Sequence, residues 1–285
     1  MTINRNEKRE QLTREGFCVF EGVLDPRTVT KLNKASDLAV SQEDPKHFKT
    51  HRAQGSLISL WKFPDTAFTE LVADPRALRV FSNLGFEHPK FWSGFIISKP
   101  PYAPPLYWHQ DSHLWGHPIG YTNQPQMYFL MYYLVDTNSE KGCLRVIPGS
   151  HRKRHALHDL DRGAHEKDEV MRADNLDHPA LKRAQGELDV PVRAGDVIIG
   201  DARLLHSANA NNSSERRTVL TLWYWPTWVD LPEEIQAMIA LKFSRSPETV
   251  LWAKKTRELT QFLIPEYSGD AAPIESNNLP GPELN

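Results

Sequence analysis

The sequence contains few cysteines, no long apolar segments and no excess of either charge. Its only cysteines are Cys18 and Cys143, which are too few for a disulfide framework or a cysteine-based zinc site and suit a reducing compartment. No apolar run reaches membrane-spanning length, and the polar start MTINRNEKREQ lacks the apolar core of a signal peptide. The 34 basic and 36 acidic residues indicate no polyanionic partner such as nucleic acid. We therefore expect a cytoplasmic protein that binds a small molecule, and composition leaves its oligomeric state open.

The length of 285 residues exceeds that of most single domains, but barrel enzymes often reach it as one unit. We therefore expect one domain over 1–285. Within 1–90, Asp25-Pro26 and Asp74-Pro75 each place a capping aspartate before a proline at the first helical position. Apolar residues follow both caps at helical spacing. This part is predicted to be a mostly helical N-terminal support.

Residues 91–225 instead contain short apolar and aromatic runs between turn-forming clusters, among them FWSGFIIS, QMYFLMYYLV, DVIIG and RTVLTLWYW. This pattern predicts a mainly β core, either a barrel or a sandwich. The charged segment 152–188 is too polar for a core strand and predicts an inserted loop or lid. Helix is expected again in 226–285, and the Pro-, Asn- and Gly-rich end predicts a flexible tail or a surface strap.

The stretch YWHQDSHLW, at 107–115, contains two overlapping metal-ligand patterns. His109 and Asp111 share a face if the segment is extended, which suits a His-x-Asp iron site. His109 and His113 align only on a helix, as in zinc metalloproteases, which also need a glutamate where this chain has Gln110. Four prolines precede the stretch and Gly116, Pro118 and Gly120 follow it, so a helix of ordinary length does not fit. We therefore predict a strand in which Gln110 faces away from His109 and Asp111 and His113 is not a ligand.

A three-ligand iron site needs one more side chain from elsewhere in the chain. His206 is the candidate, because it ends the β-like run AGDVIIGDARLLHSA, whereas most other histidines lie in polar loops. The turn cluster NANNSSE and the run RRTVLTLWYW follow, which predicts a hairpin. Since neighbours in a strand face opposite sides, only Arg217 of the Arg216–Arg217 pair can face inward with Thr221 and Trp223. A buried guanidinium there would require a carboxylate partner.

The segments WHQD, GCLRVIPGSH and AGDVIIGDARLLHSANANNSSERR resemble, in order and spacing over roughly 92–225, the phytanoyl-CoA dioxygenase family of Fe(II)/2-oxoglutarate oxygenases. The resemblance implies a double-stranded β-helix (a jelly-roll, cupin-like barrel) with flanking helices. It also implies Fe(II), with 2-oxoglutarate and O2 as co-substrates. Carried over from the family motifs, the iron ligands are His109, Asp111 and His206. Arg217, eleven residues after His206, is expected to pair with the distal carboxylate of 2-oxoglutarate, and Lys99 in SKPP is a weaker candidate for the same site.

The implied reaction is hydroxylation of an unactivated C–H bond of a small metabolite, with release of succinate and CO2. The aspartate at 111 favours hydroxylation over halogenation, while desaturation and ring formation stay open. Two other functions stay open as well, a non-catalytic cupin-like binding protein and a metal-dependent hydrolase on the same barrel.

Residues near the ligands are candidates for the substrate pocket, although burial in the barrel core is the commoner role of aromatic side chains. Aromatic side chains could hold an apolar group or an alkylammonium ion. The family often has tryptophan near the position of Met131, and Arg145 could bind an anionic substrate group or reach solvent. The candidate substrate residues are Tyr107, Trp108, Gln110, Trp115, Tyr128, Met131 and Arg145.

Overall fold

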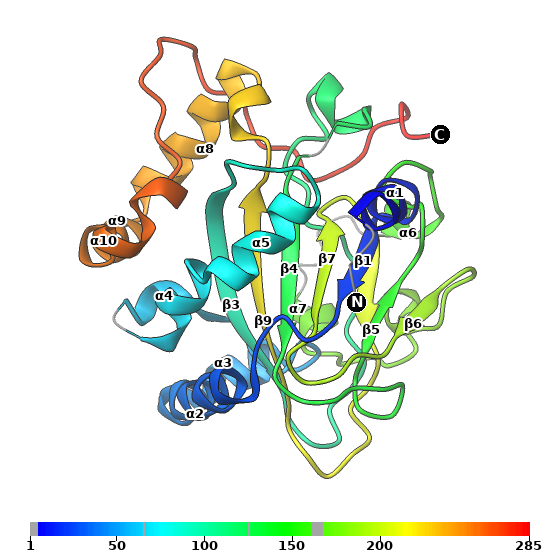
Figure 1. The fold of residues 1–285 in the computed structure, drawn as a ribbon. Helices are drawn as coiled ribbons and strands as arrows, with labels where there is room; N and C mark the ends of the chain where they lie inside the picture. The colour runs from blue at the N-terminus through cyan, green and yellow to red at the C-terminus, as the bar shows by residue number, and fades with distance from the viewer. Residues whose placement is uncertain (1–4, 65, 125, 161–167) are drawn as a thin grey trace.

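The computed structural model describes residues 5–64, 66–124, 126–160 and 168–285, which form two antiparallel sheets flanked by helices (Figure 1). The larger sheet has the strand order β1-β7-β4-β9-β3-β2, and the smaller has the order β6-β5-β8. The strands are β1 (Phe17–Phe20), β2 (Ile58–Ser59), β3 (Lys90–Lys99), β4 (Tyr128–Tyr133), β5 (Leu144–Val146), β6 (Leu188–Val190), β7 (Val197–Asp201), β8 (His206–Ala208) and β9 (Arg217–Trp225).

The helices come mainly before β3 and after β9. The α-helices are α1 (Arg5–Glu15), α2 (Pro26–Gln42), α3 (Pro45–Thr50), α4 (Ala67–Val72), α5 (Pro75–Asn83), α6 (Leu157–Leu160), α7 (Asp168–Met171), α8 (Glu233–Arg245), α9 (Pro247–Lys255) and α10 (Arg257–Thr260). Short 3-10 helices are η1 (Leu60–Lys62), η2 (Pro118–Tyr121), η3 (Pro179–Leu181), η4 (Trp228–Asp230) and η5 (Gln261–Leu263). No helix among the described residues is both long and apolar enough to cross a membrane.

The two faces of the larger sheet bury different clusters, because side chains alternate along each strand. On β4, Tyr128, Leu130 and Tyr132 pack into the core shared with α2, α4 and α5, and α5 crosses this face in Figure 1. Phe129, Met131 and Tyr133 pack with residues of the smaller sheet, among them Leu144 and Val146 on β5. The space between the two sheets therefore receives the odd-numbered side chains of β4.

The predicted helix starts are confirmed. Asp25 and Asp74 cap α2 and α5, each accepting a hydrogen bond from a backbone N–H of the first turn, and Pro26 and Pro75 begin the helices. The predicted return of helix in 226–285 is also confirmed, by α8, α9 and α10. The support segment 1–90 additionally supplies β1, which pairs with β7 at the edge of the larger sheet. The aromatic and β-branched run from Phe17 to Phe20 explains this strand.

Two predictions about strands are wrong. His206–Ala208 and Arg217–Trp225 do not form a hairpin, because β8 pairs with β5 and β9 pairs with β3 and β4. The connection between them crosses from one sheet to the other, which leaves both strands beside the space between the sheets. The stretch around His109 is not a strand either, since His109 forms a single bridge, with His206.

The two polar segments differ in where they pack. The described parts of 152–188 pack behind the segment before His109: Trp108 donates its backbone N–H to Ala180 and its indole N–H to the carbonyl of Lys182. Residues 161–167 of the predicted lid lie outside the described residues, and the lid role stays a prediction. The C-terminal residues form a strap, not a loose tail, because Asn277 pairs with Leu114 and exchanges backbone hydrogen bonds with His113 and Trp115.

Candidate metal centre and cavity

Three side chains that can bind a metal converge between the sheets. His109, Asp111 and His206 each offer a ligand atom, and these atoms all lie within 4.8 Å of one another. Asp111 Oδ1 is 3.9 Å from His109 Nε2, and Asp111 Oδ2 is 3.6 Å from His206 Nε2. Backbone hydrogen bonds in both directions tie His109 to His206. The sequence prediction that these three residues lie together agrees with this geometry, and their role as ligands stays a prediction.

Backbone carbonyls orient both imidazole rings. His109 Nδ1 lies 3.0 Å from the carbonyl oxygen of Tyr107, and His206 Nδ1 lies 3.0 Å from that of Leu204. Since a carbonyl can only accept, each Nδ1 donates its proton to the carbonyl, and in the neutral ring this leaves the lone pair on Nε2. Protein groups orient metal-binding histidines in this way. Two imidazole nitrogens and one carboxylate are a donor set that suits a mononuclear iron site.

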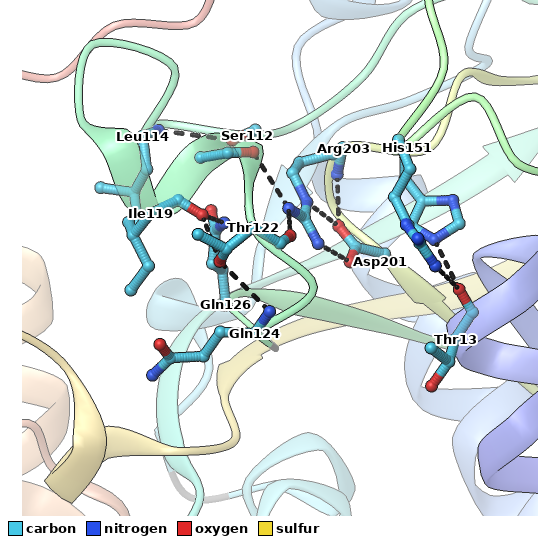
Figure 2. Close-up of polar contacts among 12 residues, drawn as sticks. Thr13, Ser112, Leu114, Ile119, Thr122, Gln124, Gln126, His151, Asp201 and Arg203 are labelled. Atoms are coloured by element: carbon cyan, nitrogen blue, oxygen red, sulfur yellow. Dashed lines mark hydrogen bonds and ion pairs between the residues drawn. The ribbon is translucent and has the colours of Figure 1, made fainter. Parts of the chain in front are cut away.

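A buried ion pair fixes the loop between β7 and β8, which leads into His206. Arg203 donates to both carboxylate oxygens of Asp201 and to the carbonyls of Gly120 and Thr122. Figure 2 shows the guanidinium between Asp201 and Thr122. Burial alone would raise the pKa of Asp201, but the charge and hydrogen bonds of Arg203 hold it below its usual value. The sequence prediction did not include this pair.

Trp223 holds the carboxylate of Asp111. Its indole Nε1 donates to Asp111 Oδ2 over 3.0 Å, and β9 places the ring in the space between the sheets. Because this hydrogen bond already fixes the orientation of the carboxylate, metal binding does not have to restrict its rotation.

We expect Trp223→Phe to weaken Fe(II) binding by roughly tenfold or more, the usual cost of losing a group that orients a metal ligand. An anaerobic Fe(II) titration measures this. The matched control is Trp92→Phe, whose indole contacts the rings of His113 and Trp225 instead of the carboxylate. Equal affinities for the two variants would contradict a role of this hydrogen bond in orienting Asp111.

Arg217 lies on the same side of β9 as Trp223, as strand parity predicted. It is buried, lines the cavity next to the ligand candidates, and forms no ion pair with any described acidic residue. Its Nε has no hydrogen-bond partner within the described chain, and burial lowers the pKa of the guanidinium. Gly142 lies close to this atom, since a Cβ at position 142 would be 3.3 Å from the Arg217 Nε. A buried cation without a partner in this setting suits an anionic ligand.

Lys99 lies beside Arg217 in the β3–β9 register but outside the cavity lining. Its amine donates to the backbone carbonyls of Ala53 and Pro104. Burial, and then the charges of Arg217 and Arg145, hold the pKa of this amine well below its ordinary value. The contact of Lys99 with the co-substrate stays a prediction.

A cavity of about 480 Å³ adjoins the three ligand candidates and Arg217. Its volume lies in the range of small-molecule sites, and its walls are mostly apolar and aromatic. Two of the seven candidate substrate residues line it, Gln110 and Met131. Gln110 was predicted to face away from His109 and Asp111, and its amide is held by Asn278, Ser112 and Trp115.

The four aromatic candidates are buried without lining the cavity. Tyr107 contacts the ring of His109, and Trp108 is held by the carbonyl of Lys182. Trp115 donates its indole N–H to Gln110. Tyr128 packs on the helical face of the larger sheet, the opposite face from Met131. These positions support the commoner, structural role for all four.

Arg145 does not reach solvent, so that alternative is wrong. It is buried, donates to Ser207 Oγ over 2.7 Å, lies 3.6 Å from Glu187 and stacks over the Trp108 ring. It is also absent from the cavity lining. The charge of Glu187 explains how a guanidinium can be buried here.

Several lining residues were not predicted from the sequence. They come from segments far from the ligand motifs: the loop before β2, η1, β3, α8, α9 and the C-terminal strap. The aromatic character of some of them signalled burial, but no local pattern connected any of them with the site. They include Gln54, Trp61, Trp92, Phe95, Lys242, Phe243, Thr249 and Asn278.

Solved structures share the fold of this chain. The non-haem alpha-ketoglutarate-dependent epimerase SnoN, from nogalamycin biosynthesis, matches with a TM-score of 0.59 at 21% identity over 78% of this chain and 82% of that one. EctD from S. alaskensis, solved with bound Fe, matches with a TM-score of 0.56 at 21% identity over 81% of this chain and 80% of that one.

The family model named phytanoyl-CoA dioxygenase (PhyH) matches residues 12–219, so the chain belongs to this family. The resemblance found in the sequence is confirmed. A "Probable alpha-ketoglutarate-dependent hypophosphite dioxygenase" of Stutzerimonas stutzeri is 28% identical over 238 residues, covering 77% of this chain and 80% of the relative. An L-proline trans-4-hydroxylase of Streptomyces griseoviridis is 31% identical over 129 residues, covering 41% of this chain and 47% of the relative.

Proposed function

We propose that this protein hydroxylates an unactivated C–H bond of a small-molecule metabolite. It is an Fe(II)/2-oxoglutarate-dependent dioxygenase of the phytanoyl-CoA dioxygenase family, with Fe(II) as cofactor and 2-oxoglutarate and O2 as co-substrates. The observation that carries the proposal is the convergence of His109, Asp111 and His206 beside Arg217, which forms no ion pair with any acidic residue that the structure describes. The named relatives act on small molecules, which supports the same substrate class for this chain.

Each of these side chains has a role in the proposal. His109, Asp111 and His206 bind Fe(II) through two Nε2 atoms and a carboxylate, and the remaining coordination positions stay open for other ligands. Arg217 pairs with the distal carboxylate of 2-oxoglutarate, since its guanidinium is buried beside the ligand candidates. The apolar cavity walls orient the substrate and exclude water. When bound, iron and 2-oxoglutarate supply the oxidising chemistry, and the protein supplies placement.

Two proposals concern the architecture. The two sheets make a double-stranded β-helix, the jelly-roll or cupin-like core, with the metal centre between them; the placement of His206 on one sheet and Arg217 on the other supports this. The chain acts as one oxygenase domain, because helices from both the N-terminal and the C-terminal segments pack on the same core.

The proposal predicts where oxygen atoms go. With isotopically labelled O2, a hydroxylase places one labelled atom in succinate and one in the product alcohol, and mass spectrometry of both products measures this. Label in succinate alone, together with a desaturated or cyclised product, would indicate that the enzyme desaturates its substrate or closes a ring instead of hydroxylating it. Turnover of a substrate by the Zn(II) form without 2-oxoglutarate would instead indicate a metal-dependent hydrolase.

A further inference from the structure

Lys242 is a cation that the proposed reaction does not use. It lies on α8 and lines the cavity. Phe243, on the same helix, lines the cavity too, and so do Ser246 and Thr249 at the start of α9. Figure 1 shows α8 and α9 on the β3 side of the larger sheet. The cavity therefore has a wall made by helices in addition to the walls made by β8 and β9, which carry His206 and Arg217.

No described acidic residue pairs with Lys242. Its side chain is half-buried, and none of the ion pairs within the described ranges includes it. Burial lowers the pKa of its amine, and no charged neighbour among the described residues raises it. The acidic residue that lines the cavity is Asp111, which the proposed function assigns to iron. A cation placed this way loses hydration without gaining a counter-charge, unless a ligand supplies one.

The surroundings of Lys242 suit a ligand with an apolar body. Trp61 meets Phe243 edge to face, with ring centroids 5.7 Å apart, and both line the cavity. Trp92, Phe95 and Trp223 add further aromatic surface. Aromatic walls alone would also attract an alkylammonium ion. The ammonium of Lys242 works against that choice, because a cation in the same cavity repels a second one.

We propose that Lys242 binds an anionic group of the substrate, a carboxylate or a phosphate ester, while the aromatic walls hold an apolar body. The inference rests on the proposed function, since it takes this cavity as the substrate site. The cavity of about 480 Å³ must hold the substrate together with 2-oxoglutarate, so the substrate is a small molecule. Arg217 then binds the distal carboxylate of 2-oxoglutarate, and Lys242 binds the anionic group of the substrate.

The test is a binding experiment that does not need turnover. The full chain, with Fe(II) and saturating 2-oxoglutarate under argon, is titrated with four probes: phenylpropionate, phenethyl phosphate, phenylpropionamide and phenylpropylamine. Quenching of tryptophan fluorescence reports binding, since three tryptophans line the cavity. We expect at least one of the two anions to bind about tenfold or more tightly than the amide, as a partly buried charged contact allows, and the amine to bind most weakly. The stronger anion identifies the substrate's acidic group.

Variants show whether Lys242 causes this preference. Lys242→Met should bring the affinity ratio of anion to amide close to one, and Lys242→Arg should keep most of it. The control is Lys255→Met, an exposed lysine at the end of α9, which should keep the wild-type ratio. The inference is overturned if the wild-type protein shows no preference for the anions, including the case in which no probe binds, or if Lys242→Met keeps the preference.

The same preparation separates this inference from the proposed function. Succinate formation from 2-oxoglutarate in air tests the function without reference to Lys242. Succinate without an anion preference overturns the inference alone. An anion preference that depends on Lys242, without succinate, overturns the proposed function and leaves an anion-binding cavity.

Discussion

Replacing His109 by alanine should abolish Fe(II) binding and reduce substrate-dependent turnover to background. The variant keeps one imidazole and one carboxylate, too few donors to hold Fe(II) against water at micromolar concentrations. His109 is also the residue whose backbone pairs with His206, so its side chain starts from a fixed position. Iron content after anaerobic loading and desalting measures the loss, and a thermal melt checks that the variant is folded.

His113→Ala is the matched control for this variant. His113 lies four residues further along, where a zinc-type helical motif would place its second ligand. Its Nδ1 lies 3.0 Å from Asn278 Oδ1, and it is not among the three grouped ligand candidates. We expect His113→Ala to keep one iron per chain. Iron in the His109 variant together with loss of iron in the His113 variant would contradict the assigned ligands.

Replacing Arg217 by methionine should raise the KM for 2-oxoglutarate by roughly a hundredfold. Losing one partner of a buried charge pair costs about 2–5 kcal/mol, and each 1.4 kcal/mol is about tenfold in affinity. The reacting groups of 2-oxoglutarate lie away from this contact in the proposal, so kcat at saturating 2-oxoglutarate should fall less than kcat/KM does. Succinate formation at varied 2-oxoglutarate concentrations separates the two parameters. Arg217→Lys should fall between wild type and the methionine variant, because lysine keeps the charge but loses the planar fork.

The neighbouring arginine provides the control. Arg216 is half-buried and donates to the carbonyl of Ser98, on the other side of the strand from the cavity. Arg216→Met should therefore leave the KM for 2-oxoglutarate within about threefold of wild type, as expected for a residue outside the site. If Arg216→Met raised the KM for 2-oxoglutarate and Arg217→Met did not, the orientation of β9 and the assignment of the co-substrate anchor would both be wrong.

Local spacing in the sequence was enough to predict that His109 and Asp111 lie together and that Arg217 faces the cavity, whereas His206 lies far away in the chain. His109 and Asp111 are two residues apart in an extended segment between prolines and glycines. The orientation of Arg217 follows from strand parity, because the run from Arg217 to Trp225 is one regular strand. Both signals depend on a few neighbouring residues, so neither requires knowledge of the tertiary fold.

The alternation of side chains along a strand, applied to every candidate, would have improved the prediction of the substrate pocket. Tyr128 and Met131 are three residues apart on one strand, so they face opposite sides of the sheet. Both were named as candidates, and only Met131 lines the cavity. The choice between the two faces depends on which side the helices cover, which is a tertiary property.

Other features depend on contacts between residues far apart in the chain. The predicted hairpin failed because strand texture does not specify the partner, and β8 and β9 join different sheets. The burial of Arg145 depends on Glu187, which sequence position alone does not connect with it. Lys242 and Asn278 reach the cavity only through the packing of α8 and the C-terminal strap, so no motif could have indicated them.

Succinate formation by the wild-type chain tests the central claim most directly. The protein is incubated with 2-oxoglutarate, Fe(II) and O2, with parallel samples that contain Zn(II) instead of Fe(II) or argon instead of air. The account predicts succinate only where Fe(II) and O2 are both present, and none from the His109→Ala chain under the same conditions. An absence of succinate from the wild-type chain with Fe(II) and O2, or equal amounts from the wild-type and His109→Ala chains, would contradict it.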